Sequence, residues 1–128
     1  MRRGRKGQVA LEYLVLSLVA LALLALSITA LMNIRSYAAH STNVFQFRSS
    51  AEELANAMAE TCALGDGNGR TIHLSAPLAI EGQEGMVRFS GAGITLVRKS
   101  ACGVQEGQQP EGDVYVENEK GVIKITAP

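Results

Sequence analysis

The chain has 128 residues, a length that predicts about one domain. Its twelve basic and twelve acidic residues cancel, and 47% of its residues are hydrophobic. Zero net charge gives no indication of a basic surface that would bind nucleic-acid phosphates. The hydrophobic content excludes a disordered chain. Two cysteines are too few for a disulfide-dense miniprotein or a four-cysteine zinc site.

The first third of the chain has a basic leader followed by an apolar run. Arg2, Arg3, Arg5 and Lys6 supply four of the twelve positive charges. The run Tyr13–Ile34 has no charge and holds eight Leu, two Val, two Ile, one Met and four Ala. A membrane-spanning helix needs roughly 20 mostly apolar residues, and the preceding charges favour a cytoplasmic N-terminus. The pattern predicts a membrane-crossing helix with an exported C-terminal part.

Two other interpretations apply to this leader. A cleaved secretory signal peptide has an apolar region of about 7–15 residues and an Ala-x-Ala site soon after it. Here Ala20-Leu21-Ala22 lies inside the run, and Ser36–Ala39 is a poor site. An uncleaved single-pass anchor is therefore the stronger alternative.

Glu12 stands at the start of the apolar helix, four residues after Gln8. A carboxylate that becomes buried needs a cation, and a new α-amino group at residue 8 would be one. Alternatively, Glu12 lies hydrated at the level of the lipid headgroups. The residues by themselves favour neither interpretation.

The segment Lys6-Gly7-Gln8-Val9-Ala10-Leu11-Glu12-Tyr13-Leu14-Val15-Leu16 resembles the class III signal peptide of archaeal type IV pilins. That family has a basic residue and Gly, followed by Gln-x-Ser-x-Glu-x-x-x-Leu. Gln8, Glu12 and Leu16 match at the family spacing, and Ala10 replaces the usual Ser.

The resemblance implies cleavage between Gly7 and Gln8 by a membrane prepilin peptidase on the cytoplasmic side, with Lys6 as the basic residue that precedes Gly7. The mature chain would have 121 residues, with eight basic against twelve acidic side chains. Glu12 would pair with an N-terminal amine during assembly. The implied partners are further copies of the chain, an assembly ATPase and a membrane platform protein. The implied location is the cytoplasmic membrane before assembly and a cell-surface filament afterwards.

Four segments follow from these patterns: a cleaved leader at 1–7, a membrane and filament-core helix at 8–35, an amphipathic continuation at 36–64 and a β-rich head at 65–128. Residues 8–64 contain no Gly or Pro, which permits one long helix. Its predicted core positions are Leu11, Leu14, Leu16, Leu18, Leu21, Ala22, Ala25 and Thr29.

The continuation has a weak stretch and an apolar face. Mediocre helix formers at 36–46 allow a bend or short break, and Ser50 followed by Glu53 fits a capping box for a new helix. The face that we expect to pack under the head comprises Phe47, Ala51, Leu54, Ala55, Met58 and Cys62.

Short strands and tight turns dominate the remainder. Thr71–Leu74 and Pro77–Ile80 are short candidates. Met86–Arg98 predicts one hairpin that turns at Gly91-Ala92-Gly93, and Val114–Thr126 predicts another. The fold class is therefore α+β, with a long N-terminal helix and a small antiparallel sheet.

Cys62 and Cys102 are both in the exported part, where cysteines commonly pair. A disulfide is favoured, and two buried free thiols are the alternative. No residue set suggests catalysis, and we expect no metal or cofactor. The Asp66–Arg70 segment lacks a third calcium ligand, and His40 and His73 have no companions.

The combined prediction is a non-enzymatic subunit of an archaeal type IV pilus-like filament that serves adhesion. The alternatives are a membrane-anchored binding module that never polymerises, and a minor pilin or pseudopilin.

Overall fold

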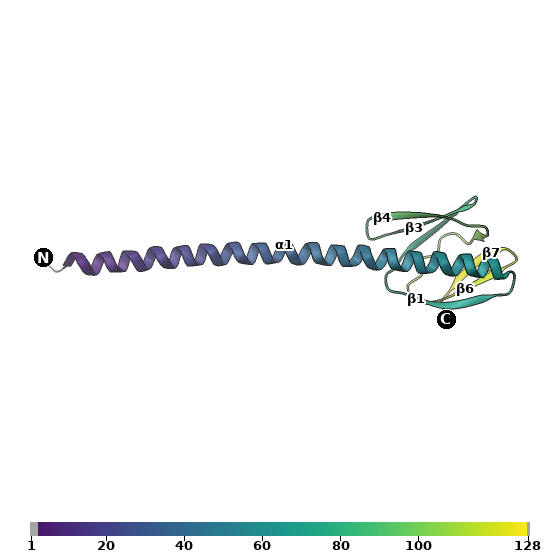
Figure 1. Ribbon diagram of the computed structural model, residues 1–128, viewed down its shortest axis with the longest axis horizontal. Helices are drawn as coiled ribbons and strands as arrows, with labels where there is room; N and C mark the ends of the chain where they lie inside the picture. The colour runs from purple at the N-terminus through teal and green to yellow at the C-terminus, as the bar shows by residue number, and fades with distance from the viewer. Residues whose placement is uncertain (1–2, 128) are drawn as a thin grey trace. The chain divides into compact units, whose positions relative to one another are not determined.

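The computed structural model describes residues 3–127, with side chains for residues 7–127. Within residues 3–127, one helix, α1 (Arg3–Leu64), precedes seven strands (Figure 1). The chain separates into two compact units, one ending at His40 and the other beginning at Ser41. We call them unit one and unit two. The strands are β1 (Gly69–Leu74), β2 (Ala79–Gln83), β3 (Met86–Gly91), β4 (Ile94–Lys99), β5 (Gly103–Val104), β6 (Gly112–Glu119) and β7 (Val122–Thr126).

In its described residues, unit one is helical throughout, and the helix begins earlier than predicted. We expected it to begin at Gln8, whereas it begins at Arg3, inside the basic leader. Arg and Lys are good helix formers, and their helical preference outweighs the Gly at positions 4 and 7. Every side chain described from residue 7 to residue 40 is exposed.

The weak stretch at 36–46 is helical without interruption. Mediocre propensity costs only tenths of a kcal/mol per residue, about 0.7 kcal/mol at most, and good helix formers flank the stretch. The break that would have started a new helix near Ser50 is absent from this described part of α1.

Unit two confirms the α+β class, with two small sheets where one was expected. The first has the strand order β1-β6-β7-β5 and the second β2-β3-β4. All pairs are antiparallel except the short β5–β7 pair, which is parallel. A single bridge between Ile80 and Gln108 links β2 to the loop after β5.

Both predicted hairpins form, each closed by a two-residue turn. Ala92 and Gly93 connect β3 to β4, and Lys120 and Gly121 connect β6 to β7. All four have positive φ, between 48° and 83°. Positive φ at both central residues defines the type I′ turn, whose twist matches that of the paired strands. The first turn is thus one residue shorter than predicted, because Gly91 pairs with Ile94.

The core of unit two lies between the C-terminal part of α1 and the two sheets, which cover the helix on two sides (Figure 1). Four residues of the predicted face are buried, while Ala55 and Cys62 are partly buried. Ser50, Ala57 and Thr61 are buried as well, each about 1% exposed. A helix covered on two sides buries a wider arc than a one-sided amphipathic pattern predicts. The principal buried side chains are Phe47, Leu54, Leu74, Leu78, Ile80, Val87, Phe89, Val114, Val116 and Ile123.

Candidate processing and assembly segment

Gly7 and Gln8, the predicted cleavage pair, lie in the first turns of α1. Nothing lies within 4 Å of the position that a Cβ on Gly7 would occupy. Glycine in a helix interior is less stable than Ala by about 1 kcal/mol, so this is a place where the helix unwinds at low cost. Peptidases bind extended backbone, and a Gly in an open setting suits that requirement. The side chain of Lys6 and residues 1–2 of the leader lie outside the described residues.

Glu12 is exposed in the first turns of α1. No ion pair joins it to any side chain in the range 7–127. A carboxylate in this position is hydrated while it is in contact with water. If it moves into an apolar environment, its cation has to come from outside this part of the chain.

The apolar run forms a continuous exposed surface on α1. Its large aliphatic side chains are about half to two-thirds exposed, from Val19 at 48% to Leu21 at 67%. Within the described range, α1 holds a window long and apolar enough to cross a membrane. The predicted helix-core positions, from Leu11 to Thr29, all lie on this surface, and the single chain buries none of them.

Hydroxyl groups within the run have partners inside the helix. Ser17 Oγ donates to the carbonyl of Tyr13 at 2.8 Å, and Ser27 Oγ donates to that of Leu23 at 2.8 Å. Thr29 Oγ1 donates to the carbonyl of Ala25 at 2.8 Å. Polar groups satisfied in this way enter hydrocarbon at low cost. The run is therefore compatible with lipid despite its hydroxyls.

In unit two, the structure joins Cys62 and Cys102 by a disulfide, with Cα atoms 6.0 Å apart. This Cα separation is common for disulfides. The bridge ties the last turn of α1 to the segment between β4 and β5, across a sequence separation of 40 residues. The disulfide thus covalently links the helix to the strands of unit two, whose hydrophobic core is small.

The structure also brings together polar residues that are far apart in the sequence. Arg98 Nη2 lies 3.6 Å from Glu52 Oε1, although the two residues are far apart in sequence. His73 Nδ1 lies 2.7 Å from Asp113 Oδ1 on paired strands. His40 is on α1 in unit one. Within the described range, no group of three or more His, Cys, Asp or Glu side chains is placed to hold a metal ion.

Comparison with known proteins gives one match, at the N-terminus. The family described as Class III signal peptide matches residues 5–30. No curated protein and no solved structure shows a significant match to the chain. The matched segment contains the predicted cleavage pair, Glu12 and most of the apolar run. Together with the fold, it supports a type IV pilin-like protein with a class III signal peptide, anchored by its apolar helix and processed by a prepilin peptidase.

Proposed function

We propose that this pilin-like protein is the structural subunit of an archaeal type IV pilus-like surface filament, and that it polymerises through α1. The observation that carries the proposal is the exposure of every described side chain from residue 7 to residue 40, in a segment dominated by large aliphatics. The described residues of the chain offer these side chains no cover, so their burial requires lipid or other copies.

The energetics support direct transfer between those two environments. Thirteen large aliphatics occupy Tyr13–Ile34. At about 2 kcal/mol each, leaving them in water costs on the order of 25 kcal/mol, an upper estimate. A helix with this surface has no stable state in water. Polymerisation therefore has to take subunits directly from the membrane, which is the role we assign to an assembly ATPase and a membrane platform protein.

Glu12 supplies specificity in this scheme. Cleavage after Gly7 would create an α-amino group at Gln8, four residues before the carboxylate. In the packed helices of a filament, that amine on a neighbouring copy would neutralise Glu12 where hydrocarbon surrounds it. A mismatched arrangement would leave a charge buried without a partner, which costs about 3–5 kcal/mol. The pair would thus favour one register between helices.

Unit two would form the outer surface of the filament and serve adhesion. Its core is its own, and its disulfide suits an oxidising exterior. We assign it no catalytic role and no cofactor.

The test combines N-terminal sequencing with filament yield. The membrane-extracted protein should begin at Gln8, and Glu12→Ala should leave cleavage intact while filament yield falls at least about tenfold, the equivalent of about 1.4 kcal/mol. The matched control is Glu53→Ala, an exposed acid on the same helix in unit two. A chain that begins at Met1, or Glu12→Ala filaments at normal yield, would contradict the proposal.

A membrane-anchored module that never polymerises is the second candidate. Unit two favours it in one respect, because its compact core needs no neighbouring copy. Electron microscopy of cells that express the chain separates the two, since an anchored module yields processed protein without filaments.

A further inference from the structure

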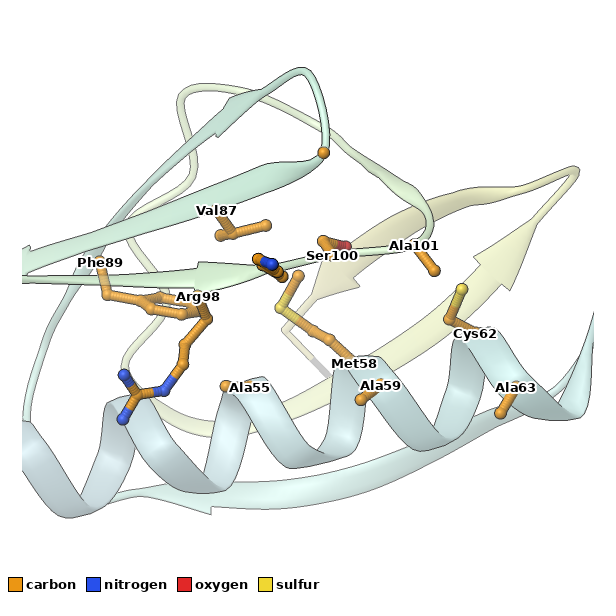
Figure 2. A pocket seen from close by; sticks show the side chains of 12 residues that line it. Ala55, Met58, Ala59, Cys62, Ala63, Val87, Phe89, Arg98, Ser100 and Ala101 are labelled. Carbon is orange, nitrogen blue, oxygen red and sulfur yellow. The ribbon is translucent and has the colours of Figure 1, made fainter.

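Unit two contains an apolar groove between the last turns of α1 and the end of β4. Its volume is about 600 Å³, and carbon atoms dominate its lining. Val87 and Phe89, each about 2% exposed or less, form the floor together with Met58. Figure 2 shows Met58 and Cys62 projecting from the helix toward the strands, with Ala55 and Ala59 on the same helix. Small-molecule sites are commonly concave, apolar and of about 300–1,000 Å³.

A second hollow of about 320 Å³ continues the groove toward Glu52 and Asn56. Ala55, Ala59 and Arg98 line both hollows. From residue 52 to residue 63, α1 rises by about 16 Å. The combined groove is thus elongated, apolar at the disulfide end and polar at the other.

The polar end of the groove carries an excess of positive charge. Arg98 is opposite Val87 in the β3–β4 register, so the two residues share one face of the sheet. Its side chain reaches from the strand toward the helix beside Ala55 (Figure 2). Glu52 is the nearest carboxylate, but it also pairs with Arg48, whose Nε lies 3.3 Å away.

Lys99 adds a further cation, since it lines both hollows. Within residues 7–127 the structure records no ion pair for it. Among the residues that line the two hollows, Glu52 is therefore the one carboxylate against two cations, and Arg48 also pairs with that carboxylate. An anionic group would complete the charge balance there, while an aliphatic chain would cover the floor.

We propose that the groove binds an aliphatic carboxylate, with its hydrocarbon chain beside Ala55 and Ala59 and its carboxylate at Arg98 and Lys99. A second copy of the chain fits less well. The most exposed aromatic side chain of unit two is Phe45, at 72%. No acidic residue lies within four positions of Phe45, and Arg48 would bring a like charge to the groove.

The test uses the full mature chain in lipid nanodiscs and a dodecanoate that carries a diazirine at its terminal carbon. Irradiation and peptide mass spectrometry then locate the labelled residues. We expect label on the α1 peptide that contains Ala55–Ala63 and its loss when excess dodecanoate competes. Label on the apolar run in unit one reports probe dissolved in lipid and serves as an internal reference.

Two variants with matched controls probe the site. Ala59→Leu should fill the groove and reduce its label at least about tenfold, whereas Ser49→Leu, at an exposed position of the same helix, should not. Arg98→Gln combined with Lys99→Gln should also reduce the label by at least about tenfold, the lower end of the range for the loss of even one hydrogen bond to a charged group. Arg88→Gln is the charge control, since Arg88 pairs with Glu81 and lines neither hollow.

Retention of the disulfide and of the helical circular dichroism shows that each variant is folded. Label that is absent from the groove, or equal in all variants, would overturn the proposal. Protein–protein cross-links from the groove in place of lipid-probe label would assign it to a second copy, and that result would overturn the proposal as well.

Discussion

Unit one and unit two place apolar side chains in opposite settings, although α1 contributes to both. In unit one, Leu21 and its neighbours are exposed, whereas in unit two Phe47 and Leu54 are at 0% exposure. Similar residues on one helix thus differ in burial because only the second stretch has strands to cover it. The stability of unit two is therefore a property of the single chain, and the environment of unit one is supplied from outside. Substitutions in unit two should therefore change its free energy of unfolding, whereas substitutions in unit one should change membrane insertion.

The largest expected effect is on the folding of unit two. Phe47→Ala should lower the free energy of unfolding of this unit by about 3–5 kcal/mol, because it removes a fully buried aromatic side chain. Leu24→Ala is the matched control, at a side chain 58% exposed in unit one, and should leave that free energy unchanged. Hydrogen exchange of the strand amides in the full chain measures both. Equal losses in the two variants would contradict the separation of the units.

Removal of the disulfide comes next. Cys62→Ala with Cys102→Ala should cost unit two about 4 kcal/mol in the chain-entropy model for a loop of this length. The membrane insertion of unit one should be unaffected. Urea unfolding of the full chain in nanodiscs, with and without a reductant, provides the measurement. A loss below about 1 kcal/mol would show that the bridge contributes little beyond the packed core.

A charge in the apolar run should affect insertion and leave the head intact. Leu24→Arg should raise the free energy of membrane insertion by about 3 kcal/mol, the cost of Arg near the centre of a transmembrane helix. Carbonate extraction of membranes measures the inserted fraction. An undiminished inserted fraction, or faster hydrogen exchange in the strands, would contradict this prediction.

Ser50→Ala tests a polar contact inside unit two. Ser50 Oγ accepts hydrogen bonds from the backbone N–H groups of Ser75 at 3.0 Å and Ala76 at 3.2 Å. The hydroxyl is buried, so its loss should cost about 1–3 kcal/mol. Ser49→Ala, at the exposed position beside it, should change the unfolding free energy little. If the two variants lose equal stability, the contact has no net value.

The smallest effect belongs to a surface ion pair. Arg70 Nη1 contacts Glu60 Oε2, and both side chains are about half exposed. Glu60→Gln should lower the stability of unit two by less than about 1 kcal/mol, the usual value for exposed pairs. The difference should shrink as salt is added. A loss that persists in high salt would point to a packing role for the side chain.

The features that depend on local pattern were predictable from the amino-acid sequence. The spacing of Gln8, Glu12 and Leu16 indicated the class III signal peptide, and the uncharged run indicated a helix able to cross a membrane. Alternating apolar residues with Gly at the turns located both hairpins. These signals are readable because each depends on residues close together in the chain.

The contacts between distant segments, in contrast, follow from how the chain packs in three dimensions. The capping-box pattern at Ser50 is typical of a helix N-terminus, but α1 continues through this residue because its neighbours favour a helix. The Ser50 hydroxyl instead accepts hydrogen bonds from backbone N–H groups between β1 and β2. Ala57 and Thr61 are buried because the two sheets cover α1 on two sides, and neither residue belongs to the single apolar face that the sequence pattern predicts. Arg98 and Glu52 became neighbours because β4 packs beside α1, and this is also how the groove arises. Local conformations such as a continuous or a broken helix differ little in free energy, and long-range packing determines which one forms. Short-range sequence patterns therefore do not predict the outcome.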